Sequence, residues 1–145
     1  MAKFSWDTDG VELPKLDYSM VEDWIVRVAE SHGKTIGRLG YLLCDDETML
    51  EANRQYLGHD YYTDIITFDY SHDDRISGDM IISLDTIRSN AEMVGDSFRR
   101  EMLRVFVHGV LHLCGINDKG PGEREIMESH EDAALAMINP DECFT

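Results

Sequence analysis

The sequence has few basic residues, few cysteines and no long apolar run. Only 13 Lys and Arg stand against 29 Asp and Glu, so the formal net charge is −16 at pH 7. A general nucleic-acid binder is normally basic, which argues against binding through overall charge. No apolar run approaches the roughly eighteen residues of a membrane span, and residues 1–11 lack the apolar core of a signal peptide. We therefore expect a cytoplasmic protein with no membrane segment.

The three cysteines are an odd number and do not follow the spacing of a zinc finger. We expect Cys44, Cys114 and Cys143 to be reduced thiols. Cys114 lies only two residues past His112 in an expected helix. It should therefore point away from the side on which that histidine binds a ligand.

The length of 145 residues predicts a single domain over 1–145, with 43% hydrophobic residues, as is ordinary for a globular protein. Apolar periodicity predicts helices and strands in alternation. The expected strands are 4–6, 36–44, 65–70 and 79–83, and the expected helices are 19–33, 45–58, 84–95, 97–114 and 123–138. In the last helix we expect Ile126, Met127, Ala133, Ala134 and Met137 to point inward. The pattern predicts an α+β fold, with a small mixed sheet covered by helices.

His108 and His112 are the strongest chemical signal. Four residues apart on a helix, they lie one turn above each other, roughly 6 Å apart, and both imidazoles can bind one zinc ion at about 2.0–2.1 Å. Gly115 ends the helix, so the chain can double back and bring Asp118 into range. Two histidines and a carboxylate with one position left for water are a common arrangement of catalytic zinc. The alternative is a buried helix that merely contains two histidines.

One other ligand and one other chemistry are less favoured by the sequence. His130, on the last expected helix, is the reserve third ligand if Asp118 points away. No Glu follows His108, so the H-E-x-x-H pattern of metalloproteases is absent and a peptidase is disfavoured.

Residues 108–118, H-G-V-L-H-L-C-G-I-N-D, resemble the YbeY family signature H-G-x-L-H-L-x-G-Y-D-H. Residues 53–68, N-R-Q-Y-L-G-H-D-Y-Y-T-D-I-I-T-F, are similar to the family's N-x-x-Y-R-x-x-D-x-P-T-D-V-L-S-F. Residues 78–82, G-D-M-I-I, are similar to G-D-I-x-I. The three motifs occur in the family's order and spacing. The chain therefore resembles a family of bacterial metal-dependent endoribonucleases linked to ribosomal RNA maturation.

The resemblance implies a zinc-dependent endoribonuclease that cuts single-stranded RNA in ribosomal RNA processing and ribosome quality control. It implies metal binding by His108, His112 and Asp118. It also implies that Asn53, Arg54, Thr63 and Asp64 lie near the substrate, which follows from no physical argument on these residues alone.

Three positions depart from the family pattern: Asp118 replaces its third histidine, Asn117 its aspartate and Leu57 its arginine. Asp118 makes the site harder, so another divalent metal such as manganese is possible. Leu57 removes a guanidinium thought to help catalysis, and Arg54, on the same helix face, is a possible stand-in. The alternative function is therefore a ribosome-associated binding factor with a structural metal and little catalysis.

In the enzyme hypothesis, metal-bound water acidified towards neutral pH attacks the phosphodiester. The general base is not assigned, with Asp64 and Asp79 as its candidates. RNA affinity is expected to be weak and salt-sensitive, either through a strip of arginines from Arg88 to Arg104 or through delivery by a basic ribosomal protein.

Overall fold

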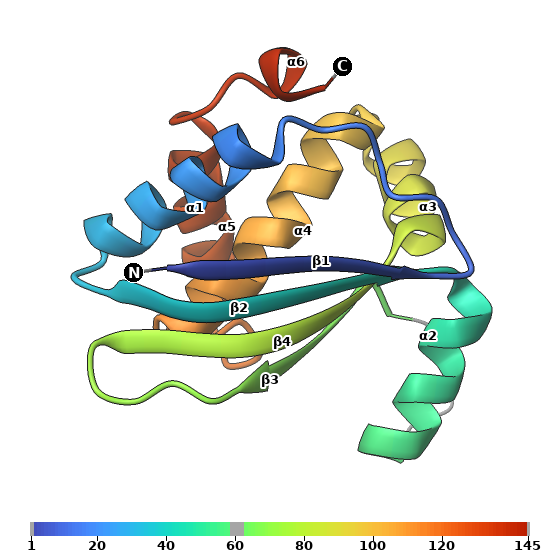
Figure 1. The fold of residues 1–145 in the computed structure, drawn as a ribbon, viewed down its shortest axis with the longest axis horizontal. Helices are drawn as coiled ribbons and strands as arrows, with labels where there is room; N and C mark the ends of the chain where they lie inside the picture. Colours follow the sequence, from blue (N-terminus) through green and yellow to red (C-terminus); the bar gives the residue numbers. More distant parts are fainter. Residues whose placement is uncertain (1, 59–62, 145) are drawn as a thin grey trace.

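The computed structural model describes residues 2–58 and 63–144. Within these residues, four strands form one mixed sheet. The strand order is β1-β2-β4-β3 (Figure 1). Strands β1, β2 and β4 are parallel, and β3 runs antiparallel to β4 at one edge. Their bounds are Lys3–Asp9 for β1, Thr35–Cys44 for β2, Ile65–Asp69 for β3 and Arg75–Ser83 for β4. The predicted α+β class and the mixed sheet are confirmed.

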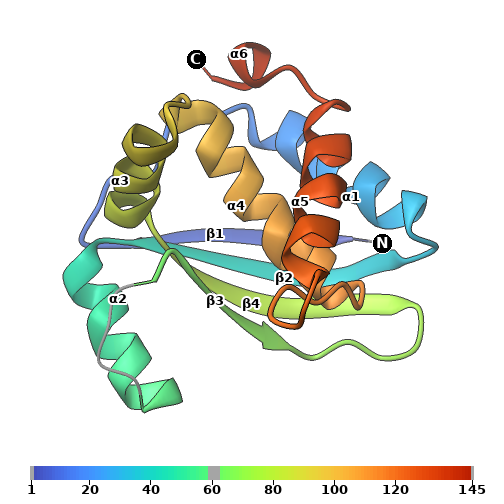
Figure 2. The same cartoon turned by 180° about the vertical axis from the view of Figure 1, so that it is seen from behind.

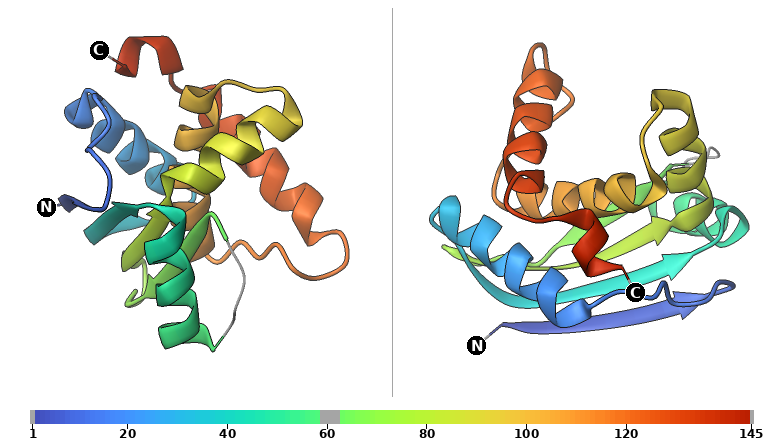
Figure 3. Two further views of the ribbon diagram at one scale, coloured as in Figure 1. Left: turned by 90° about the vertical axis from the view of Figure 1, so that its right-hand side faces the viewer. Right: turned by 90° about the horizontal axis from the view of Figure 1, so that it is seen from above.

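Helices cover one face of the sheet almost completely, as Figures 2 and 3 show. The main core lies between this face and the helices and includes Trp24, Tyr41 and Phe106, all fully buried or nearly so. A smaller core lies on the opposite face, where Met49 packs with Cys44 and Ile66. The helices are α1 Tyr18–Ser31, α2 Asp46–Ala52, the π-helix η1 Asn53–Leu57, α3 Leu84–Val94, α4 Phe98–Leu113, α5 Glu123–Leu135 and α6 Pro140–Cys143.

Two predicted boundaries, the start of a helix and the start of a strand, were wrong. Helix α1 begins at Tyr18, one residue before the expected start at residue 19. The Asp17 carboxylate caps it by accepting from the Met20 amide, and the Tyr18 ring packs on Trp6. Strand β4 begins at Arg75, four residues before the prediction, because residues 70–77 pair as a hairpin. Residues 60–62 of the predicted loop 60–63, and His59 before it, lie outside the described residues.

The inward face of α5 also differs from the prediction. Ile126 is 55% exposed and Ala133 is exposed, whereas Met127, Glu131, Ala134 and Leu135 are buried. The helix ends at Leu135, and Pro140 begins the short helix α6. The buried stripe therefore contains a carboxylate, a residue type that apolar periodicity does not select.

Helix α4 lies close to the sheet, and a glycine on each side of their contact leaves out a side chain. A Cβ at Gly109 would lie 2.5 Å from the Met80 sulfur on β4 and 3.1 Å from Ile65 Cδ1 on β3. A Cβ at Gly78 would lie 3.1 Å from Leu113 Cδ1 on α4. The space that these glycines leave determines the depth at which α4, and His108 next to Gly109, are held.

We predict that Gly109→Val lowers the free energy of unfolding by about 1–3 kcal/mol, because the added carbons overpack the contact with β4. Met93→Val is the control, since Met93 is 83% exposed on α3, and its effect should stay within about 0.5 kcal/mol. Urea denaturation measures both values. Equal stability of the two variants would show that the contact tolerates a side chain.

Candidate metal centre

Helix α4 presents His108 and His112 on the one side that the core does not cover. Ser97 caps the helix by accepting from the Arg100 amide at 3.1 Å, and ten of its residues are buried. The His108 side chain is 24% exposed, whereas His112, one turn nearer the helix end, is exposed. Both histidines line one cavity.

Asp118 lies beside His108, on a loop that turns back after the helix. Gly115 adopts a φ of +98°, which a residue with a Cβ rarely does, and so reverses the chain direction. Asp118 Oδ2 is 3.3 Å from His108 Nε2. This contact places a carboxylate oxygen next to the Nε2 atom of His108.

The cavity has a volume of about 310 Å³ and brings together most of the residues predicted from the sequence. Its lining comprises Asn53, Leu57, Thr63, Asp64, Ile65, Ile66, Thr67, His108, His112, Asp118 and Lys119. Arg54 is exposed and is not part of this lining, so its role as a stand-in for Leu57 stays a prediction. Lys119 was not singled out, although it directly follows Asp118 and is a cation at the cavity.

The donors fit a zinc ion in kind, since imidazole nitrogen and carboxylate oxygen are both zinc ligands. Within residues 2–58 and 63–144, however, no three His, Cys, Asp or Glu converge closely enough to hold one ion. Asp118 Oδ2 already lies 3.3 Å from His108 Nε2, so binding of one ion by all three residues would require a change in side-chain positions.

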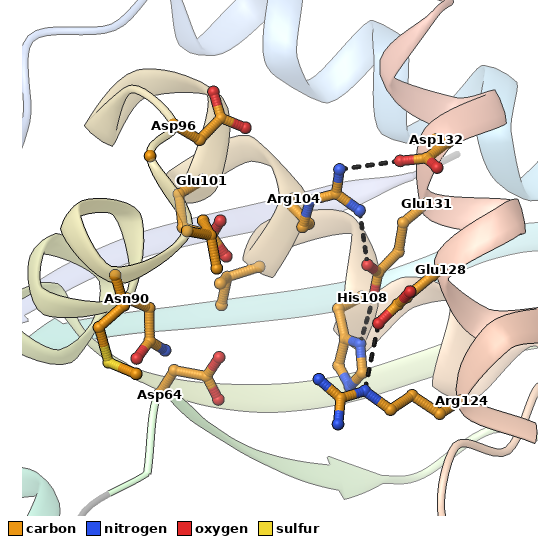
Figure 4. A pocket seen from close by; sticks show the side chains of 14 residues that line it. Asp64, Asn90, Asp96, Glu101, Arg104, His108, Arg124, Glu128, Glu131 and Asp132 are labelled. Atoms are coloured by element: carbon orange, nitrogen blue, oxygen red, sulfur yellow. Dashed lines mark hydrogen bonds and ion pairs between the residues drawn. The ribbon is translucent and has the colours of Figure 1, made fainter.

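Glu131 was missed by the sequence analysis and makes the shortest polar contact to His108. Its Oε2 lies 2.6 Å from His108 Nδ1, and its Oε1 accepts from Arg104 at 2.9 Å. The second guanidinium nitrogen of Arg104 donates to Asp132 at 2.8 Å. Figure 4 shows this row of side chains, with Glu131 between Arg104 and His108. The sequence feature that could have indicated it is its helical spacing, which places Glu131 on the same side of α5 as the buried Met127, Ala134 and Leu135.

A second, larger cavity of about 740 Å³ lies between α3, α4 and α5 and shares Asp64 and His108 with the first. Its charged lining residues are Asp64, Asp96, Glu101, Arg104, His108, Arg124, Glu128, Glu131 and Asp132 (Figure 4). Carboxylates outnumber the arginines in this lining. The two cavities therefore meet at His108, in an acidic environment.

Burial and neighbouring charges shift three pKa values at this junction. Burial alone would lower the pKa of His108, but the hydrogen bond and charge of Glu131, with Asp118 and Asp64, raise it overall. Burial raises the pKa of Asp64, although His108 opposes the shift. Burial likewise raises the pKa of Glu101, against the attraction of Arg104. A cation at the junction would relieve the crowding of these carboxylates.

The arginines from Arg88 to Arg104 do not form one free strip. Arg88 stacks on Phe98 at 4.4 Å. Arg99 pairs with Asp141, Arg100 with Asp96, and Arg104 with Glu131 and Asp132. Nearby carboxylates pair with three of the four guanidinium groups, and RNA binding by this strip stays a prediction.

Three further candidates lie away from the cavity. The His130 ring packs edge-on to His32, with centroids 5.0 Å apart, so the reserve ligand is directed elsewhere. Cys114 is outside the cavity lining, and burial raises its pKa to about 11, which keeps the thiol neutral. Asp79 lines a hollow on the opposite face of the sheet with Arg38, which removes it as a candidate general base.

We predict that Glu101→Gln stabilises the protein at neutral pH. Glu101 is 9% exposed, and its raised pKa means that ionisation costs more in the folded than in the unfolded state. The gain should disappear as the pH falls below about 4.3, the pKa of an unperturbed glutamate, where the side chain is neutral in both states. The exposed Glu92→Gln is the control. Melting temperatures across this range that are the same as for the unchanged protein would contradict the prediction.

Comparison with known proteins identifies the family. Residues 7–139 match the family model described as Endoribonuclease YbeY. The chain is 59% identical to Endoribonuclease YbeY of Bacteroides thetaiotaomicron, covering 92% of this chain and 97% of that protein. It is 58% identical to the Phocaeicola vulgatus protein of the same name (93% and 98% covered) and 41% identical to that of Flavobacterium psychrophilum (96% and 97% covered).

The fold also has a solved counterpart. A Thermotoga maritima protein determined in solution superposes with a TM-score of 0.66 at 20% sequence identity, covering 92% of this chain and 87% of that one. At this identity the likeness shows the fold alone. The match over residues 7–139 and the full-length relatives together show that this chain belongs to the YbeY family.

Proposed function

We propose that this protein is a metal-dependent endoribonuclease that cuts single-stranded RNA. It would act in the cytoplasm, in ribosomal RNA processing and ribosome quality control. The observation that carries the proposal is the gathering of His108, His112 and Asp118 around one cavity in a chain whose relatives are named as endoribonucleases.

His108, His112 and Asp118 are the residues that would hold the metal, which we take to be zinc. A zinc ion there supplies a water acidified towards neutral pH and a positive charge for the phosphodiester. Asp118, close to His108 Nε2, would orient that imidazole face towards the cavity. Asp64, which lines both cavities, is a carboxylate that could accept a proton.

The substrate would lie along the cavity between η1, β3 and the loop after α4. Asn53, Thr63 and Lys119 are part of its lining. Lys119 offers a cation to a phosphate where Leu57 offers none. Since the chain carries a charge of −16, we expect weak RNA affinity unless a basic partner such as a ribosomal protein delivers the RNA.

The test compares the purified protein, His108→Ala and a chelated sample on a single-stranded RNA, with a duplex of the same sequence as a second substrate. We expect cleavage of the single strand by the untreated protein only. Equal residual cleavage in all three samples would indicate a contaminant. The alternative of a ribosome-associated binding factor would then replace the enzyme, since Leu57 occupies the cavity where the family pattern has arginine.

We predict that His112→Ala loses stoichiometric zinc, because the two remaining ligands hold zinc poorly. His72→Ala is the matched control, since the His72 side chain is 91% exposed and lies on the hairpin before β4. Elemental analysis after gel filtration measures the zinc content. Unchanged zinc in the His112 variant would refute the ligand assignment.

Asp118→His should raise the affinity for zinc relative to manganese. A carboxylate oxygen favours manganese more than an imidazole nitrogen does, so the natural residue makes the site harder. Competition titrations of both proteins with the two metals give the ratio. The same ratio for both proteins would mean that Asp118 is not a ligand.

A further inference from the structure

Glu131 has both carboxylate oxygens engaged by different partners. It is 6% exposed and projects from the face of α5 that packs on α4. Oε1 accepts from Arg104 at 2.9 Å, and Oε2 lies 2.6 Å from His108 Nδ1. Arg104 is in turn held by Asp132 at 2.8 Å. The Glu131 side chain is therefore fixed from two sides.

The chemistry of these partners determines where the hydrogen of a neutral His108 ring lies. A guanidinium only donates hydrogen bonds, and an ionised carboxylate only accepts them. Because Glu131 can offer only an acceptor, the short contact is made when Nδ1 carries the hydrogen and donates it to Oε2. Nε2 is then left bare, and it is the nitrogen that lies 3.3 Å from Asp118.

We infer that Glu131, locked by Arg104, is a positioning residue that holds His108 in the Nδ1–H tautomer with Nε2 available to a metal ion. The inference rests on the proposed metal centre, but its first readout does not require metal or RNA. A metal-binding histidine commonly donates its second ring N–H to a carboxylate or carbonyl, which fixes its tautomer and orientation. Nothing in the family motifs includes Glu131.

Glu131→Gln tests the inference because it keeps the shape but halves the number of acceptor oxygens. Arg104 needs an acceptor and is kept in place by Asp132, so the amide oxygen should turn to Arg104 and the NH₂ group to His108. Nδ1 must then accept, and the hydrogen moves to Nε2. Asp132→Asn is the matched control, since Asp132 also contacts Arg104 but does not contact His108.

The tautomer is read by nitrogen NMR of the imidazoles in metal-free protein, at a pH well above the His108 pKa so that the ring is neutral. We expect Nδ1–H in the unchanged protein and in Asp132→Asn, and a shift towards Nε2–H in Glu131→Gln. Zinc affinity, measured by competition with a chromophoric chelator, should fall about 10–100-fold in Glu131→Gln only. The double variant Arg104→Met/Glu131→Gln should recover Nδ1–H, because the single oxygen is then free for His108.

Nε2–H in the unchanged protein would overturn the inference, as would an unchanged tautomer and zinc affinity in Glu131→Gln. Failure of the double variant to recover Nδ1–H would also contradict it. If Glu131→Gln acted only by disturbing the local structure, a second substitution would increase the disturbance and would not restore Nδ1–H. If Glu131→Gln does not fold, the tautomer of the unchanged protein decides. Absence of RNA cleavage with the expected tautomers would count against the proposed function and leave the inference standing.

Discussion

The close packing of α4 against the sheet is the constraint on which the rest depends. Gly109 on α4 and Gly78 on β4 leave out the side chains that would separate the two elements. The helix therefore buries most of its surface, and its uncovered side carries His108 and His112 into a cavity bounded by β3 and the loop after α4. Because His108 and His112 belong to this packed helix, the core fixes the positions of their backbone atoms.

The charges around His108 are arranged as a compensated network. An unpaired buried carboxylate costs far more than a paired one, and Glu131 is paired with both Arg104 and His108. Asp64 and Glu101 are less well compensated, which is why burial raises both pKa values. The region is therefore suited to a cation, while three of the arginines nearby pair with carboxylates.

Local patterns predicted the parts of the molecule that local physics determines. The strands and most helices follow from periodicity, and the spacing of His108 and His112 and the turn at Gly115 placed both histidines and Asp118 at one cavity. Resemblance, not spacing, grouped Asn53 and Asp64 with them. Glu131 could not be found this way, because its contact with His108 joins residues 23 positions apart and depends on how α5 packs on α4. The Asp17 cap and the early start of β4 rest instead on local contacts, between Asp17 and Met20 and within the hairpin of residues 70–77, which apolar periodicity does not detect.

The central claim is that His108, His112 and Asp118 bind one metal ion together. X-ray absorption at the zinc edge of the zinc-loaded protein tests it most directly. The account predicts two imidazole nitrogens and one carboxylate oxygen from the protein at about 2.0–2.2 Å, with no sulfur near 2.3 Å. A sulfur neighbour, or an imidazole count other than two, would contradict it.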